Sequence, residues 1–125
     1  MLIKRISFPT PLEDVIDIEN DNIDVFVELE NSSYVYTLVL ITPKNIESLI
    51  DKERKNYFGP GHPFIIVKQL TEEIIVETIT AYAEKDDAYW LKLYHFANDI
   101  DTFVFNQLQA KHIEYLKELD KLDNS

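Results

Sequence analysis

Alternating apolar and polar positions in the first third of the chain predict β-strands. Between residues 23 and 30 every second residue is apolar, which leaves Asp24, Phe26 and Glu28 on the opposite face of the predicted strand. Residues 34–41, rich in β-branched and aromatic side chains, and residues 2–8 predict two further strands. A turn at residues 31–33 joins two of them, and a loop with an even number of residues places Val27 opposite Tyr36.

Residues 11–19 fit two kinds of local structure. Thr10-Pro11-Leu12-Glu13 has the form of a capping box with proline at the first helical position, which favours a helical turn. Val15, Ile16 and Ile18 are β-branched and favour a strand instead. We expect a turn followed by a short strand.

Helical periodicity begins after residue 41. Thr42 and Pro43 start a predicted helix that ends near residue 55 and turns three apolar side chains inward, those of Ile46, Leu49 and Ile50. A loop with the only two glycines of the chain, Gly59 and Gly61, leads to a predicted buried strand at residues 64–68. Thr71 then caps a helix whose first turn carries two glutamates, as the helix dipole favours.

Two more helices are predicted in the last third of the chain. Asp86 and Asp87 are expected to cap a helix over residues 88–97, which is apolar nearly all round and therefore expected to be covered on several sides. The last helix, residues 100–122, carries an apolar stripe with alternating spacings of three and four, formed by Phe105, Leu108, His112, Tyr115, Leu119 and Leu122. We expect it to pack on its own domain. The alternative is a homodimer that forms through this helix.

Together these elements predict an α+β fold. An N-terminal antiparallel sheet of about four strands, one of them contributed after the first helix, packs against three to four helices, and the C-terminal half is helical. Residues 1–122 are expected to form a single domain, and residues 123–125 a disordered tail.

The distribution of charge narrows the choice of partners. The net charge is −11, and residues 6–43 contain eight carboxylates and no lysine or arginine. Nucleic-acid binding relies on cationic side chains, so it is not expected. The negative electrostatic field of the chain also repels anionic membranes. It attracts a basic protein instead and raises the rate of that association. The chain has no cysteine, no signal-peptide pattern and no apolar run long enough for a membrane span, so we expect a cytoplasmic protein.

Few residues carry a pattern typical of catalysis or ligand binding. With two glycines the chain lacks a phosphate-binding loop, and no serine has a patterned partner. His95 and Asp99 are four residues apart, but no third ligand motif accompanies them. We therefore expect no catalytic residue, no metal and no cofactor. The alternative is a small enzyme or ligand-binding domain whose pocket is rimmed by His62, Trp90 and His95.

The acidic strands remain the strongest functional candidate. We expect a non-enzymatic protein that binds a basic protein partner, because apolar anchors ringed by charge are typical of such interfaces. A bacterial immunity protein that occludes a cationic toxin is one concrete form of this hypothesis. The expected partner-binding residues are Asp17, Glu19, Asp24, Phe26, Glu28 and Glu30.

Overall fold

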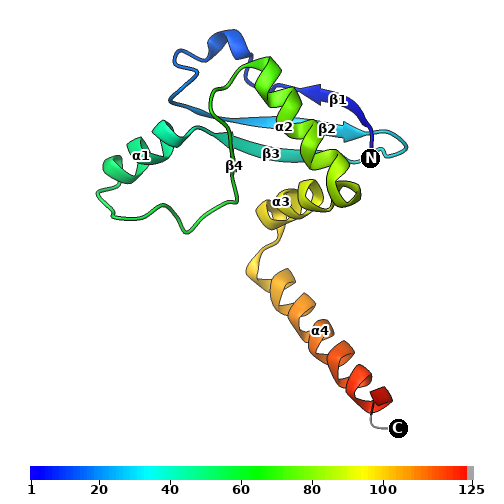
Figure 1. The fold of residues 1–125 in the computed structure, drawn as a ribbon. Coiled ribbons are helices and arrows are strands. Elements are labelled where there is room, and N and C mark those ends of the chain that lie inside the picture. The colour runs from blue at the N-terminus through cyan, green and yellow to red at the C-terminus, as the bar shows by residue number, and fades with distance from the viewer. Residues whose placement is uncertain (124–125) are drawn as a thin grey trace.

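A four-stranded sheet with helices on one face forms the body of the molecule in the computed structural model, which describes residues 1–123 (Figure 1). The strands are β1 (Ile3–Ser7), β2 (Asn22–Leu29), β3 (Val35–Ile41) and β4 (Ile65–Ile66), in that spatial order. The first three are antiparallel, and β4 runs parallel to β3. The predicted α+β class, with one strand contributed after the first helix and a helical C-terminal half, is confirmed.

The register between β2 and β3 agrees with the alternation in the sequence. Val27 lies opposite Tyr36, and Val25 lies opposite Leu38, on the inner face of the sheet. Phe26 lies opposite Thr37 on the outer face. Since neighbouring residues of a strand point to opposite faces, this register separates a buried apolar face from an exposed mixed one.

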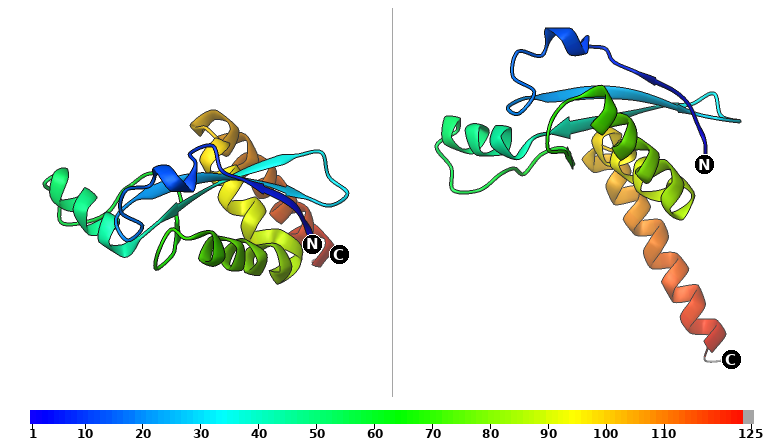
Figure 2. Two further views of the ribbon diagram at one scale, coloured as in Figure 1. Left: turned by 90° about the horizontal axis from the view of Figure 1, so that it is seen from above. Right: turned by 45° about the horizontal axis from the view of Figure 1, so that its top comes forward.

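The helices are α1 (Pro43–Lys52), α2 (Glu72–Glu84), α3 (Tyr89–Asp99) and α4 (Thr102–Asp123), with short 3₁₀ turns at η1 (Leu12–Asp14) and η2 (Lys85–Ala88). Figure 2 shows α2 and α3 on the same side of the sheet. Ile75, Ile79 and Ala83 of α2 and Leu91 of α3 are buried with the inner-face residues of the sheet in one apolar core. We call residues 1–101 the head.

Threonine caps place α1 and α2. The Thr42 hydroxyl accepts a hydrogen bond from the Asn45 backbone N–H, and the Thr71 hydroxyl accepts one from the Ile74 N–H. Both caps agree with the predicted helix starts. The predicted strand at residues 64–68 is shorter than expected, because only Ile65 and Ile66 pair with β3.

The short strand expected after residue 14 is wrong. Residues 12–14 form the turn η1, and the chain continues without regular structure to Asp21. The neighbouring edge of β2 is already occupied by β1, so this segment finds no strand to pair with. Ile16 is consequently 100% exposed, and of the three β-branched residues at positions 15, 16 and 18 only Val15 belongs to the core.

The connection between α2 and α3 also differs from the prediction. Asp86, Asp87 and Ala88 all adopt left-handed backbone conformations, and neither aspartate caps α3 with its side chain. Aspartate tolerates this conformation better than most residues, because its short polar side chain bonds locally. Helix α3 is not covered on several sides. It buries Leu91 and His95, and leaves Tyr89, Trp90, Leu93 and Phe96 exposed.

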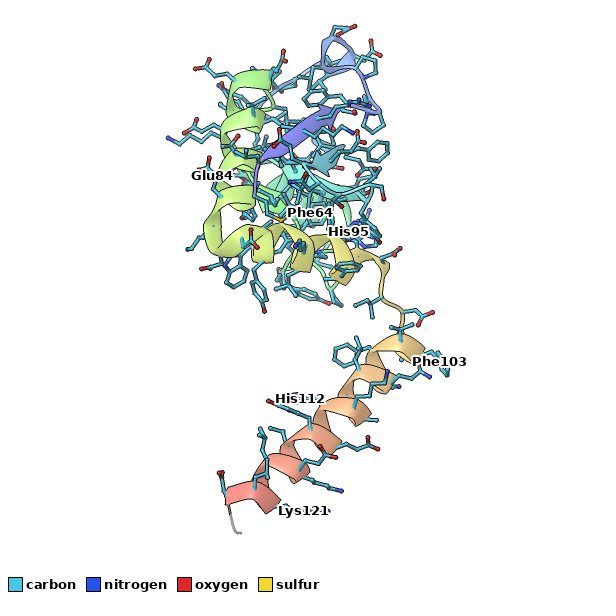
Figure 3. All side chains as sticks on the ribbon, turned by 90° about the vertical axis from the view of Figure 1, so that its right-hand side faces the viewer. Phe64, Glu84, His95, Phe103, His112 and Lys121 are labelled. Carbon is cyan, nitrogen blue, oxygen red and sulfur yellow. The ribbon has the colours of Figure 1, made fainter. Side chains whose placement is uncertain are left out.

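The last helix does not pack on the head, contrary to expectation. Figures 1 and 3 show α4 running away from the head, and each of its residues from Thr102 to Asp123 is exposed. Its 22 residues give it a length of about 33 Å. Of the predicted tail, Asp123 is the last residue of α4, and the other two lie outside the described residues.

Candidate functional site

Three of the six predicted partner-binding residues share the outer face of β2. Asp24, Phe26 and Glu28 alternate with buried residues there, and Val39, Thr37 and Val35 of β3 lie opposite them. We call these six residues the open sheet face. Phe26 is 36% exposed, so an aromatic side chain stands between the two carboxylates. The predicted arrangement of charge around an apolar residue is therefore present on this strand.

A cation from β1 reduces the charge of this face. The Arg5 guanidinium lies 3.4 Å from the Glu28 carboxylate (Nη1 to Oε2), because β1 places Arg5 opposite Glu28. Of the two carboxylates on the open sheet face, Asp24 alone carries an uncompensated charge among the described residues. The open sheet face is consequently less acidic than the sequence of β2 and β3 suggested.

The other three predicted residues lie elsewhere. Asp17 accepts a hydrogen bond from the Glu19 backbone N–H at 3.0 Å, and Glu19 accepts one from the Gln69 side chain at 2.9 Å. Both therefore belong to the loop that precedes β2, which contacts the segment after β4. Glu30 follows the opposite end of β2, where it lines a shallow hollow with Lys4. The structure does not gather the six residues into one surface.

His95 closes the free edge of β3. Its Nδ1 accepts a hydrogen bond from the Thr37 backbone N–H at 2.9 Å, and its Nε2 lies 3.2 Å from the Tyr34 hydroxyl. An acceptor at Nδ1 assigns the neutral ring with its proton on Nε2. The ring is 7% exposed and packs among Tyr34, Tyr36 and Phe96. Both nitrogens are thus engaged in holding α3 against the sheet.

His62 and Trp90 line two separate hollows. His62 is exposed beside a groove of about 380 Å³ between the end of α1 and the loop that follows, where Gly59 takes a φ of +93°. Trp90 donates from Nε1 to Asp86 at 3.1 Å and flanks a hollow of about 250 Å³ with Tyr82 and Tyr94. His62, Trp90 and His95 therefore do not meet in one pocket.

The hollow beside Trp90 is lined by one tyrosine hydroxyl with a perturbed pKa, that of Tyr82. Burial raises the pKa of the Tyr82 hydroxyl, and the neighbouring Tyr94 raises it further through its charge and a hydrogen bond. This hydroxyl stays protonated well above neutral pH. Among residues 1–123, no three His, Cys, Asp or Glu side chains are grouped so that they would hold a metal ion.

Many exposed apolar side chains lie on α4, where the sequence indicates a stripe but not its exposure. The apolar stripe consists of Phe105, Leu108, His112, Tyr115, Leu119 and Leu122. Phe105 is 59% exposed, Tyr115 57% and Leu108 50%. Figure 3 shows the side chains of α4 projecting with no other described segment beside them. Charged residues gather on the other side of the helix, including Glu114, Lys117 and Lys121.

The stripe continues into an apolar groove at the junction of α3 and α4. The groove has a volume of about 600 Å³, and its lining comes mainly from Leu93, Phe96 and Ile100 of the head and from Phe105 and Leu108 of α4. Leu93 and Phe96 are exposed although both are large and apolar. The stripe and the groove therefore form one continuous apolar surface, which we call the α4 surface.

Comparison of the chain with protein-family models, with curated proteins and with solved structures finds no match. Within residues 1–123, every helix is too short or too polar to cross a lipid bilayer.

Proposed function

We propose that this chain is a protein-interaction module that docks a protein partner on the α4 surface. The observation that carries the proposal is the apolar stripe of α4, which the head leaves exposed over its whole length. Single exposed apolar residues are common on protein surfaces, but a contiguous patch of several large ones is typical of an interaction site.

The energetics of α4 support the same role. Most of the stability of helices in proteins comes from packing an apolar face rather than from intrinsic helix propensity. Full burial of one leucine, isoleucine or phenylalanine side chain contributes about 1.5–3 kcal/mol. The head supplies little of that burial to α4, so a docked partner stabilises the helix by covering the stripe. Partner binding and helix stability are therefore coupled.

The shape of the surface selects a helical partner. The stripe is straight, about 26 Å long from Phe105 to Leu122, and its spacings of three and four suit the packing of side chains between two helices. A partner that presents an amphipathic helix fits the α4 surface best.

A basic protein remains a second candidate partner, through the open sheet face. Asp24 and Phe26 are exposed there beside Val35, which gives an apolar anchor next to an uncompensated carboxylate. The net charge of −11 favours approach of a cationic protein, such as the toxin partner of an immunity protein. The head would supply this contact, independently of α4.

Site-specific photo-cross-linking tests the proposal. A benzophenone amino acid replaces Leu108 on the stripe in one variant and Ala110 in a matched control. Because Ala110 is two positions from both Leu108 and His112, it lies on the opposite side of the helix. In cells that produce the chain, we expect a protein adduct from the Leu108 position and little from Ala110. Equal yields from the two positions would refute docking on the stripe.

A further inference from the structure

We infer that the occupant of the α4 surface is α4 of a second copy of this chain, packed antiparallel. The inference rests on the proposed function and adds the identity and direction of the partner helix. It depends on three features: the order of large side chains along the stripe, the charges beside it, and the charge of the head.

An antiparallel pair matches the stripe with itself over its whole length. When His112 of one copy faces Tyr115 of the other, Leu108 faces Leu119 and Phe105 faces Leu122, and the two-fold axis repeats each pairing. Every residue of the stripe then faces a stripe residue of the second copy, and the polar ring of His112 lies beside a tyrosine. A parallel pair instead places His112 against His112 and Tyr115 against Tyr115.

The charged residues at the edge of the stripe favour the antiparallel direction. Lys111 and Glu118 lie on the same edge, each one residue before a stripe residue, and both are exposed. In the antiparallel pair Lys111 of each copy faces Glu118 of the other, which gives two complementary contacts. In the parallel pair Glu118 faces Asp123 instead, which gives two repulsive ones.

The charge of the head favours the same direction. Helix α4 carries three lysines and four carboxylates, so ten of the eleven net negative charges belong to the head. A parallel pair would hold two such heads side by side, whereas an antiparallel pair separates them by the length of α4, about 33 Å. That separation exceeds the screening length of about 8–10 Å at moderate salt, so the heads repel each other little.

The groove at the α3–α4 junction extends the contact. The six stripe residues span fewer than the three to four heptads from which a coiled coil is reliably predicted. The paired α4 helices alone therefore form a short contact. In the antiparallel pair the last turns of one α4 lie against Phe105 and Leu108 of the other, where the groove opens. The exposed side chains of Leu93 and Phe96 in the head are then next to the end of the second helix, so each copy covers both parts of the α4 surface.

Charge substitutions in the full-length chain test this arrangement by sedimentation equilibrium. We expect the wild type to be a dimer and Glu118→Lys to raise its dissociation constant about tenfold, since two attractive contacts become repulsive. Lys111→Glu has the same effect, and the double variant Lys111→Glu/Glu118→Lys returns to within about threefold of the wild type. A parallel dimer predicts the opposite for Glu118→Lys, because the new lysine would face Asp123 and tighten the association.

Disulfide formation between introduced cysteines tests independently whether the two α4 helices are parallel or antiparallel. The experiment is feasible because the chain has no native cysteine. Leu108→Cys and Leu119→Cys proteins are mixed and oxidised, and the products are counted by mass spectrometry. An antiparallel pair forms mainly the mixed disulfide, because two copies of position 108 lie about 16 Å apart along the helices, beyond the reach of a disulfide of about 7 Å between Cα atoms. Mainly homodisulfides, or none, would overturn the inference.

The outcomes separate this inference from the proposed function. A chain that stays monomeric at high concentration, yet is cross-linked from position 108 to a different protein, overturns self-association and retains docking on α4. A monomeric chain with no adduct specific to position 108 overturns both.

Discussion

Replacing His95 by phenylalanine tests whether this histidine serves the fold rather than chemistry. Phenylalanine retains the ring contacts with Tyr34, Tyr36 and Phe96, whose centroids lie 4.9–5.4 Å from that of His95. It removes the acceptor of the Thr37 backbone N–H, which lies 2.9 Å from Nδ1 at the free edge of β3. A buried donor without a partner costs about 1–3 kcal/mol, so we expect His95→Phe to lower the free energy of unfolding by about 2 kcal/mol.

Urea unfolding followed by circular dichroism measures this loss. For a slope of about 1–3 kcal/mol per molar urea, the midpoint falls by about 1 M. Tyr34→Phe is the matched control. It removes only the longer contact of 3.2 Å at Nε2 of His95, and it leaves Nδ1 in place as the acceptor of the Thr37 backbone N–H. We expect its loss to stay below about 1 kcal/mol. Equal midpoints for the two variants, or an unchanged exchange rate of the Thr37 amide proton, would refute the edge-capping role.

Three further predictions concern the core, the hollow beside Trp90 and the open sheet face. Leu91→Ala in α3 should lower the free energy of unfolding by about 2–5 kcal/mol, whereas Leu108→Ala in monomeric protein changes it by less than about 0.5, and equal losses would contradict an exposed α4. The pKa of Tyr82 is raised in the folded state, so the stability that this residue contributes is complete below its unfolded pKa of about 10 and is lost as the pH rises through the folded pKa. Between pH 9 and about 11.5, the unfolding midpoint should therefore fall less steeply with pH for Tyr82→Phe than for the wild type. If a basic partner binds the open sheet face, Asp24→Lys should lower the affinity for that partner about tenfold at low salt, whereas Asp51→Lys on α1 should have little effect. Equal losses of affinity for the two variants would mean that net charge alone attracts the partner.

The pairing of β2 with β3 could be predicted from the sequence, because it depends on features of a short, continuous segment of the chain. Alternation fixes which residues of β2 and β3 face the core, and an even loop fixes their register, so Val27 and Tyr36 were placed opposite each other correctly. The threonine caps of α1 and α2 were predicted for the same reason. The pairing of Arg5 with Glu28 was not, because the register of β1 on β2 depends on a break in the pairing between Ile3 and Arg5 that leaves no clear mark in the sequence.

The position of α4 could not be predicted, although its stripe was visible. Spacings of three and four show that a helix has an apolar face, but they are the same whether its own domain or another chain covers that face. The distinction comes from tertiary structure: α2 and α3 already cover the inner face of the sheet, so α4 does not pack there. The same lack of long-range information explains why His62, Trp90 and His95 were grouped at one pocket, whereas the fold places them apart.

Hydrogen exchange of the α4 backbone amides, measured at several concentrations of the full-length chain, shows directly whether a second copy covers α4. If the stripe is a docking surface for a second copy, the amides of α4 exchange fast in dilute solution and become protected as the concentration rises, while those of β2 and β3 stay protected throughout. The variant Leu108→Lys/Leu119→Lys should remove this dependence, and Gln107→Lys/Ala110→Lys, with the same change in charge off the stripe, should retain it. Strong protection of α4 at concentrations where sedimentation shows the chain to be monomeric would contradict self-association, because α4 would then be covered by its own head.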